Sequence, residues 1–191
     1  MIVTVIWEDQ RGSRQGFGPH DLLLSCVADE LDRGPGWHQK RKWCSAHLAS
    51  VPKKGNGVVL KALRNETETL SKSGPLFAVL DHDQVVGLWP KETQPPSCIP
   101  GIVEAMKRDA PGRYELVLLR SNIETVVDAA CQALHQPQQA KSTPDARDHP
   151  LQKLAWGTPA QRDIVRATVA DFDRLVRKVT ELFRIQFVCD C

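Results

Sequence analysis

A nearly unbroken apolar run occupies residues 2–7 of this chain, Ile2-Val3-Thr4-Val5-Ile6-Trp7. β-branched residues dominate it, and it lacks the polar alternation of a strand that faces water on one side. A second run of this kind, Leu76-Phe77-Ala78-Val79-Leu80, is followed at once by acidic residues. Both runs predict strands that are buried on both faces, as in a parallel sheet covered by helices.

Segments with helical periodicity separate the predicted strands. We expect strands over residues 2–7, 42–51, 76–80 and 114–119, and helices over residues 21–31, 58–70, 101–109 and 123–134. Parallel strands need long crossover connections, which are usually helical. The order of elements therefore predicts an α/β fold with a compact, open, mainly parallel four-stranded sheet flanked by helices.

The rest of the chain predicts a polar linker and a long helix. Residues 135–157 are expected to be a surface linker, because their first part is rich in Gln, Pro, Ser and Asp. The sequence Thr158-Pro159-Ala160-Gln161 is a capping box with proline at the first helical position. It opens a predicted C-terminal helix over residues 158–191 that packs on an α/β domain of residues 1–134, with Arg162 and later arginines mostly off its apolar face.

Composition narrows the class of protein. The 191 residues are 41% hydrophobic and 25% charged, with a net charge of +2, which is typical of a globular domain and too neutral for a nucleic-acid coat protein. No apolar run approaches the roughly 20 residues of a membrane helix. The six cysteines contain no C-x-x-C pair, which favours free thiols over disulfides or structural zinc. We expect a cytoplasmic protein with no membrane partner.

Acidic residues follow three of the predicted strands, where ligands bind in open parallel sheets. They are Glu8 after the first strand, Asp81 and Asp83 after the third, and Glu124 beyond the fourth. In extended chain, Asp81 and Asp83 would project to the same side. Carboxylate oxygens are the ligands that Mg²⁺ prefers, and Mn²⁺ accepts them too. This pattern predicts a metal site that faces a phosphodiester, with Glu8 binding the metal or moving protons.

These residues resemble a known family. A strand followed by Glu8, and a later strand followed by Asp81-His82-Asp83, are similar to the Toprim domain of topoisomerases, bacterial primases and small nucleases, including those of the overcoming-lysogenization-defect type. The resemblance covers about residues 1–134, and Asn122-Ile123-Glu124 is similar to a segment of standalone Toprim-like proteins in bacterial antiviral defence systems. It implies that the glutamate is a general acid or base and that the Asp-x-Asp pair binds Mg²⁺. Asp9 stands where these domains usually have glycine, so either Glu8 or Asp9 can be the active acid, and Glu124 is a supporting acid.

Two basic clusters suit the phosphate backbone of a nucleic acid. They are Lys53 and Lys54, in a loop that continues Gly55-Asn56-Gly57, and the run Lys40-Arg41-Lys42. Such side chains neutralise phosphates without reading bases. The loop lacks the Gly-Lys-Ser/Thr ending of a nucleotide P-loop, so ATP binding is not expected.

The sequence therefore predicts a Mg²⁺-dependent nuclease of Toprim type that acts on DNA or RNA. The resemblance adds a protein partner from the same system, with this chain as the effector subunit of a bacterial defence system. One alternative is a catalytically silent α/β module that binds a protein partner through its C-terminal helix. Another is a phosphatase-like hydrolase of small phosphate esters. A topoisomerase is not expected, because the single tyrosine, Tyr114, lies in a predicted strand.

Overall fold

A computed structural model describes residues 1–8, 18–53, 55–82, 85, 99–109, 112–120, 122–136 and 149–189 of the chain. The strands are β1 (Val3–Trp7), β2 (Leu48–Pro52), β3 (Leu76–Asp81) and β4 (Glu115–Leu119). The helices are α1 (Pro19–Leu31), α2 (Trp37–His47), α3 (Asn56–Leu70), α5 (Ile99–Asp109), α6 (Asn122–Ala133), α7 (Pro150–Ala155), α8 (Pro159–Thr168) and α9 (Ala170–Cys189). Among these described helices, none has both the length and the apolar composition that crossing a bilayer requires.

The four strands form one parallel sheet in the order β2-β1-β3-β4. In the middle of the sheet, Trp7 of β1 pairs with Pro52 of β2 on one side and with Val79 of β3 on the other. Because all strands run the same way, their last residues share one edge of the sheet, which we call the carboxyl edge. The predicted α/β fold with a four-stranded parallel sheet is confirmed.

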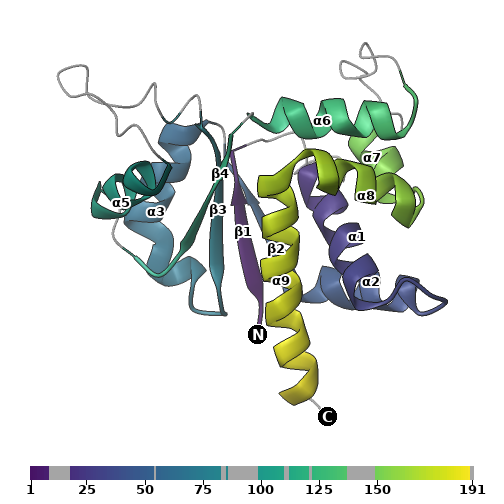
Figure 1. The fold of residues 1–191 in the computed structure, drawn as a ribbon. Coiled ribbons are helices and arrows are strands. Elements are labelled where there is room, and N and C mark those ends of the chain that lie inside the picture. Colours follow the sequence, from purple (N-terminus) through teal and green to yellow (C-terminus); the bar gives the residue numbers. More distant parts are fainter. Residues whose placement is uncertain are drawn as a thin grey trace.

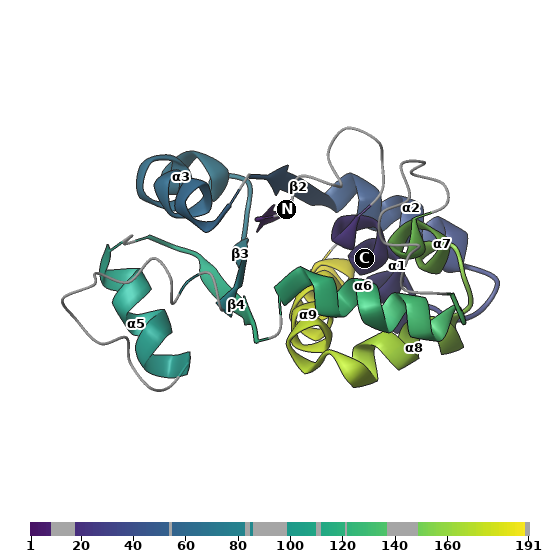
Figure 2. The ribbon, with the colours of Figure 1, turned by 90° about the horizontal axis from the view of Figure 1, so that it is seen from above.

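Helices cover both faces of this sheet (Figures 1 and 2). One face carries α3 and α5, and the other carries α1, α6 and α9 with α2, α7 and α8 beside them. Val5 and Trp7 belong to the larger core under α1, α6 and α9, whereas Ile6 between them belongs to the smaller core under α3. A strand whose two faces are both buried needs no polar alternation, which explains the apolar run at residues 2–7.

The second strand is shorter than the sequence predicts, because most of residues 42–51 belong to helix α2 and the strand begins only at Leu48. Within α2, Trp43 stacks on His47 one helical turn later, with ring centroids 4.1 Å apart. Arg41 on the same helix bonds to α1. Such contacts outweigh the weak strand propensity of a mixed sequence.

The residues expected to form a surface linker, 135–157, include the short helix α7. Its Leu151 and Leu154 are buried in the larger core, where α7 packs against α1. Residues 137–148 of the expected linker lie outside the described residues. Burial of these two leucines stabilises the packing of α7 on the domain.

The expected C-terminal helix consists of two helices. α8 opens with the predicted capping box, in which the Gln161 N–H donates to Thr158 Oγ1 and the Thr158 N–H donates to Gln161 Oε1. Val169 leaves the helical conformation, with φ −115° and ψ 83°, and α9 starts at Ala170. This break turns the chain so that α9 lies along the sheet while α8 packs on α6 and α1 (Figure 1).

Candidate functional site

Glu8 and Asp81 meet at the carboxyl edge of the sheet. Glu8 directly follows β1, Asp81 is the last residue of β3, and these two strands are neighbours. The backbone N–H of Asp81 donates to Glu8 Oε2 at 3.1 Å, across a separation of 73 positions in the chain. The Asp81 residue is only 4% exposed. Parallel pairing thus brings two of the expected acids together.

The backbone of Glu8 is held by the loop between β2 and α3. The Gly55 N–H donates to the carbonyl oxygen of Glu8 at 3.3 Å, and the Lys53 N–H donates to that of Trp7 at 2.7 Å. Gly55 has φ 85°, a left-handed conformation that favours glycine. The loop in which the sequence suggested phosphate contacts therefore also positions Glu8 at the start of α3.

Three predicted site residues, Asp9, Lys54 and Asp83, lie outside the described residues. β3 ends at Asp81, and His82 already has helical backbone conformation. Alternation of side chains between the two faces applies only to extended chain. The alternation expected to bring Asp81 and Asp83 to one side therefore ends at Asp81, and metal binding by this pair stays a prediction.

Glu124 stands in the first turn of α6 and is exposed to solvent. Within the described ranges, no group of three or more His, Cys, Asp or Glu side chains is arranged to hold a metal ion. Glu124 therefore does not complete a set of three with Glu8 and Asp81. An acid in a first helical turn also interacts favourably with the helix dipole, which is a structural role.

Arg41, one of the predicted phosphate-binding residues, joins α2 to two other elements. Its Nε donates to Ser25 Oγ at 2.9 Å, and its Nη2 lies 3.2 Å from Asp21 Oδ1. The guanidinium group also lies over the ring of Trp156, 4.0 Å from the ring centroid. Burial lowers the pKa of Arg41, and the nearby Asp21 carboxylate acts in the opposite direction. This residue is therefore a structural cation as well as a candidate phosphate ligand.

The other predicted cations lie nearer to solvent. Lys53 Nζ is 3.2 Å from Glu66 Oε2 of α3, a pair whose glutamate is half exposed. Lys42 is exposed on α2, and Lys40 on the same helix is partly buried. Exposed ion pairs contribute little, so a phosphate can compete with Glu66 for Lys53. Nucleic-acid binding by these residues stays a prediction.

His20, in the first turn of α1, is a partly buried histidine whose environment the sequence does not reveal. Its Nδ1 makes no hydrogen bond with the described part of the chain. Burial first, and the nearby charge of Arg41 second, lower the pKa of His20 to about 4. At neutral pH the ring is therefore uncharged, which suits a structural role better than the phosphate contact that a protonated ring would make.

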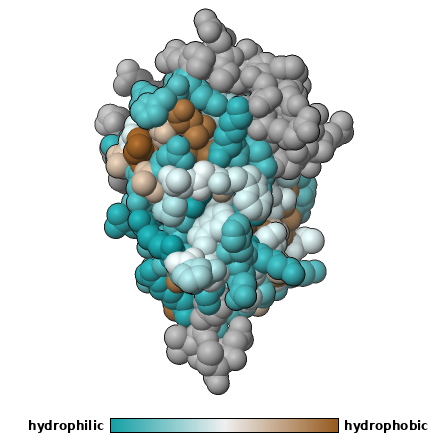
Figure 3. Space-filling model, turned by 90° about the vertical axis from the view of Figure 1, so that its right-hand side faces the viewer, coloured by the Kyte–Doolittle hydropathy of each residue, from teal (hydrophilic) through white to brown (hydrophobic). Residues whose placement is uncertain are grey.

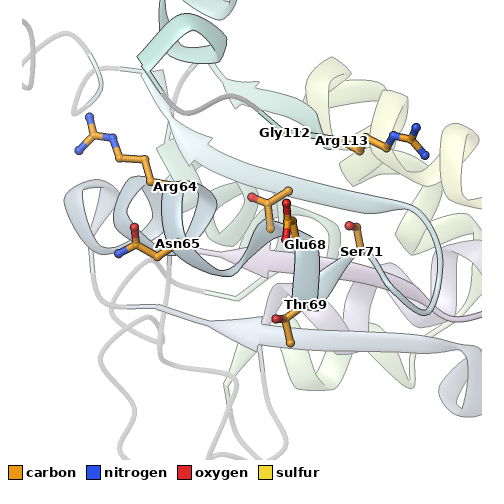
Figure 4. Close-up of a pocket in the computed structure, with 8 residues that line it drawn as sticks. Arg64, Asn65, Glu68, Thr69, Ser71, Gly112 and Arg113 are labelled. Carbon is orange, nitrogen blue, oxygen red and sulfur yellow. The ribbon is translucent and has the colours of Figure 1, made fainter.

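A pocket of about 490 Å³ lies between the C-terminal half of α3 and the segment Gly112-Arg113 that precedes β4. α3 starts after β2 and ends before β3 begins, so this pocket lies at the edge opposite to Glu8 and Asp81. In Figure 4, Arg64 and Arg113 point away from each other and Glu68 lies between them. The two guanidinium groups do not converge, so they are not placed to bind one phosphate together.

Arg162, which the sequence places mostly off the apolar face, is instead buried, with 1% of its side chain exposed. It pairs with Asp29 of α1, whose side chain is equally buried. A buried arginine is stable only beside an acid and further acceptors, and the fold supplies these to Arg162. Asp29 lies 133 positions away in the chain, so no local sequence pattern predicts this pair.

The side of the molecule that carries α2, α7 and α8 is largely hydrophilic, with a compact hydrophobic area in its upper part and smaller ones elsewhere (Figure 3). Among the apolar side chains of these elements, Trp156 is 53% exposed and Ile164 46% exposed. Isolated exposed apolar residues are normal on protein surfaces. The described residues on this side therefore form no extended apolar surface that would identify a function.

Comparisons of the chain with protein-family models, with curated proteins and with solved structures find no match.

Proposed function

We propose that the protein is a Mg²⁺-dependent nuclease that hydrolyses phosphodiester bonds at the carboxyl edge of its sheet, in the way of the Toprim domains that residues 1–134 resemble. The observation that supports this most is the hydrogen bond from the Asp81 N–H to Glu8 Oε2. It places a carboxylate and a buried acid at the ends of adjacent strands, where open parallel sheets bind their ligands.

The donor groups at this edge fit Mg²⁺ in their chemistry. Glu8 and Asp81 are the described residues that would hold the ion, and Asp83 is the third ligand predicted from the sequence. Mg²⁺ usually takes one or two protein carboxylates and fills its other positions with water and phosphate oxygens. When bound, the ion would polarise the phosphoryl group and favour ionisation of water; Mn²⁺ would do the same.

Glu8 is the residue proposed for proton transfer. Hydrolysis removes a proton from the attacking water as its oxygen bonds to phosphorus, and adds a proton to the leaving oxygen as the P–O bond breaks. The Asp81 N–H orients the Glu8 carboxylate, and the Gly55 N–H holds its backbone. A glutamate held at its carboxylate and at its backbone loses little freedom when it meets the substrate.

The nucleic acid is proposed to be held by its phosphates. Lys53 belongs to the loop that holds Glu8, because its N–H bonds to Trp7, the residue before Glu8. Lys54 is the next residue of this loop. Lys40, Arg41 and Lys42 on α2 would add charge neutralisation along the strand. Contacts to phosphates do not read the base sequence, so DNA and RNA are both candidate substrates.

The resemblance to Toprim proteins is the sole basis for one further part of the proposal, namely that the protein acts in a defence system together with a partner protein.

Nicking of supercoiled plasmid DNA and cleavage of labelled RNA, with Mg²⁺ or Mn²⁺, test this function. We expect cleavage by the natural protein and a loss of about 100-fold or more in Glu8→Gln and Asp81→Asn. Glu104→Gln, which removes an exposed acid on α5, is the matched control and keeps full activity. Thermal melting shows whether each variant is folded.

Two results would contradict the nuclease. If the natural protein stays inactive on DNA and RNA with both metals, alone and with the proteins encoded beside it, the proposal is wrong. If it hydrolyses small phosphate esters and ignores polynucleotides, it is a phosphatase-like enzyme instead.

The interaction module is less well supported. The apolar side chains of α9 that it would need are fully buried in the larger core: Phe172, Leu175, Val176, Val179 and Phe183. A partner of this helix would therefore have to bind its polar side or the exposed Ile185 near its end. That burial favours the nuclease over docking through the C-terminal helix.

A further inference from the structure

Strand β4 forms one outer edge of the sheet. Its hydrogen-bonded neighbour is β3, and no other strand of the described residues pairs with it. The outer side of such a strand presents N–H and C=O groups in a row that matches another extended chain. Its surroundings therefore decide whether another chain can reach it.

The outer side of β4 faces a groove between two helices. Seen from above, β4 lies between α5 and α9 (Figure 2). The groove has a volume of about 630 Å³ and is lined by α5, by residues 114–116 and by α9. Tyr114 and Leu116 pack into the core under α5, whereas Glu115 points the other way and pairs with Lys178 of α9. The start of β4 thus forms the floor of the groove and the two helices form its walls.

The opposite edge strand, β2, is built differently. Its last residue is Pro52, which has no N–H to offer, and it also contains Ser50. β4 reads Glu115-Leu116-Val117-Leu118-Leu119 and contains no proline. Proline and charged residues are the usual means by which natural sheets prevent pairing at their edges. β4 has only Glu115, at its first position, so its edge is the one suited to accept a strand.

The groove is positively charged. Among the described residues that line it, the cations are Lys107 of α5 with Arg174 and Lys178 of α9, and the acid is Glu115. Lys107 is exposed. Arg174 is half exposed and lies 3.8 Å from Asp171, a long contact of little strength. Two copies of this protein joined edge to edge through β4 would bring these cations together, which electrostatic repulsion disfavours.

We propose that this groove is a docking site for an extended, acidic segment of a partner protein, which joins the sheet as a strand beside β4. Backbone hydrogen bonds to β4 supply affinity, and carboxylates of the segment reach Lys107 and Arg174. The groove does not include Glu8 or Asp81, so this inference stands or falls independently of the nuclease.

The test is binding of a fluorescein-labelled peptide of repeating Glu-Glu-Val to the full chain, followed by fluorescence anisotropy at low salt. This repeat places carboxylates on both faces of an extended chain, so they can face both walls of the groove. We expect saturable binding, and binding at least about tenfold weaker for a peptide with Pro in place of Val, which has the same charge but fewer N–H groups. The double variant Lys107→Glu/Arg174→Glu is expected to bind at least about tenfold more weakly. Lys61→Glu, an exposed charge reversal on α3, is the matched control and binds normally.

Hydrogen exchange reports the position of the peptide. We expect slower exchange of the amides in residues 114–119 when the acidic peptide is bound. Equal binding of the Val and Pro peptides would overturn the proposal, because charge alone would then explain the contact. No binding at about 1 mM peptide would also overturn it. So would a dimer whose β4 amides are protected without peptide, since a second copy would then occupy the edge.

Discussion

Arg162 and Asp29 form a bidentate ion pair in the interior of the protein. Arg162 Nε donates to Asp29 Oδ2 at 2.6 Å and Nη2 donates to Oδ1 at 2.7 Å. The remaining nitrogen, Nη1, donates to the carbonyl oxygens of Leu154, Ala155 and Gly157. One side chain thus connects α1, the end of α7 and the start of α8, and holds the C-terminal helices on the sheet.

Removing Arg162 should strongly destabilise the fold. Arg162→Met leaves the Asp29 carboxylate buried without its partner, which costs about 3–5 kcal/mol and lowers the melting temperature by about 10 °C. Denaturant unfolding followed by circular dichroism measures the change. Arg33→Met is the matched control, because its pair with Asp163 is exposed by 51% and 41% and is worth less than about 1 kcal/mol.

A double variant separates charge burial from packing. Asp29→Leu/Arg162→Met removes both charges, so it should recover part of the stability that Arg162→Met loses. Recovery stays incomplete, because three carbonyl groups lose their donor. If Arg162→Met costs no more than Arg33→Met, the structural role assigned to the buried pair is wrong.

His20 should make stability fall as the pH falls below neutral. Its pKa is about 4 in the folded protein and about 6.5 in an unfolded chain. Between these values the unfolded chain binds a proton that the folded protein does not, so acid favours unfolding in this window. From pH 7 to pH 5.5, the natural protein should lose about 1 kcal/mol more than His20→Gln.

Urea unfolding at the two pH values measures this difference. The neighbouring Asp21, whose pKa burial raises against the influence of Arg41, is present in both proteins, so its contribution largely cancels. Equal pH dependence of the two proteins would show that the folded protein does not keep His20 neutral.

Buried thiols should resist alkylation in the folded protein. Burial raises the pKa of Cys44 to about 12, and burial also raises the pKa of Cys26. Because the thiolate is the reactive form, a short iodoacetamide pulse at pH 8 should leave Cys26, Cys44 and the buried Cys131 unmodified. Mass spectrometry of the digested protein locates the label, and a pulse in denaturant is the control. Equal labelling of Cys26 in both samples would contradict its burial.

Two glycine substitutions should change stability in opposite directions. Gly74 has φ 150°, and an added Cβ would lie 2.5 Å from the backbone oxygen of Ile2. Gly74→Ala should therefore cost about 2 kcal/mol. Gly57, in the first turns of α3, has open space around it, and Gly57→Ala should stabilise by up to about 1 kcal/mol. Thermal melting compares both, and an unchanged Gly74→Ala would refute the close approach to Ile2.

Much of the fold follows from local pattern. Residues 2–7 and 76–80 are apolar throughout, and a strand buried on both faces is the element that such short runs favour. The capping box at Thr158 was also predictable, because its two residues lie three apart and act on each other. At the candidate site, the meeting of Glu8 and Asp81 was predictable, since parallel strands end at one edge.

Other features depend on neighbours that are distant in the chain. Helix α2, the turn at Val169 and the burial of Arg162 arise from packing against α1 and the sheet, which no short window of residues encodes. The groove beside β4 exists because the strand order leaves β4 outermost between α5 and α9. The periodicity of apolar residues along a chain indicates which side of an element is buried. The energy of a long-range contact depends instead on which element packs against that side. Only the tertiary structure determines that pairing of elements.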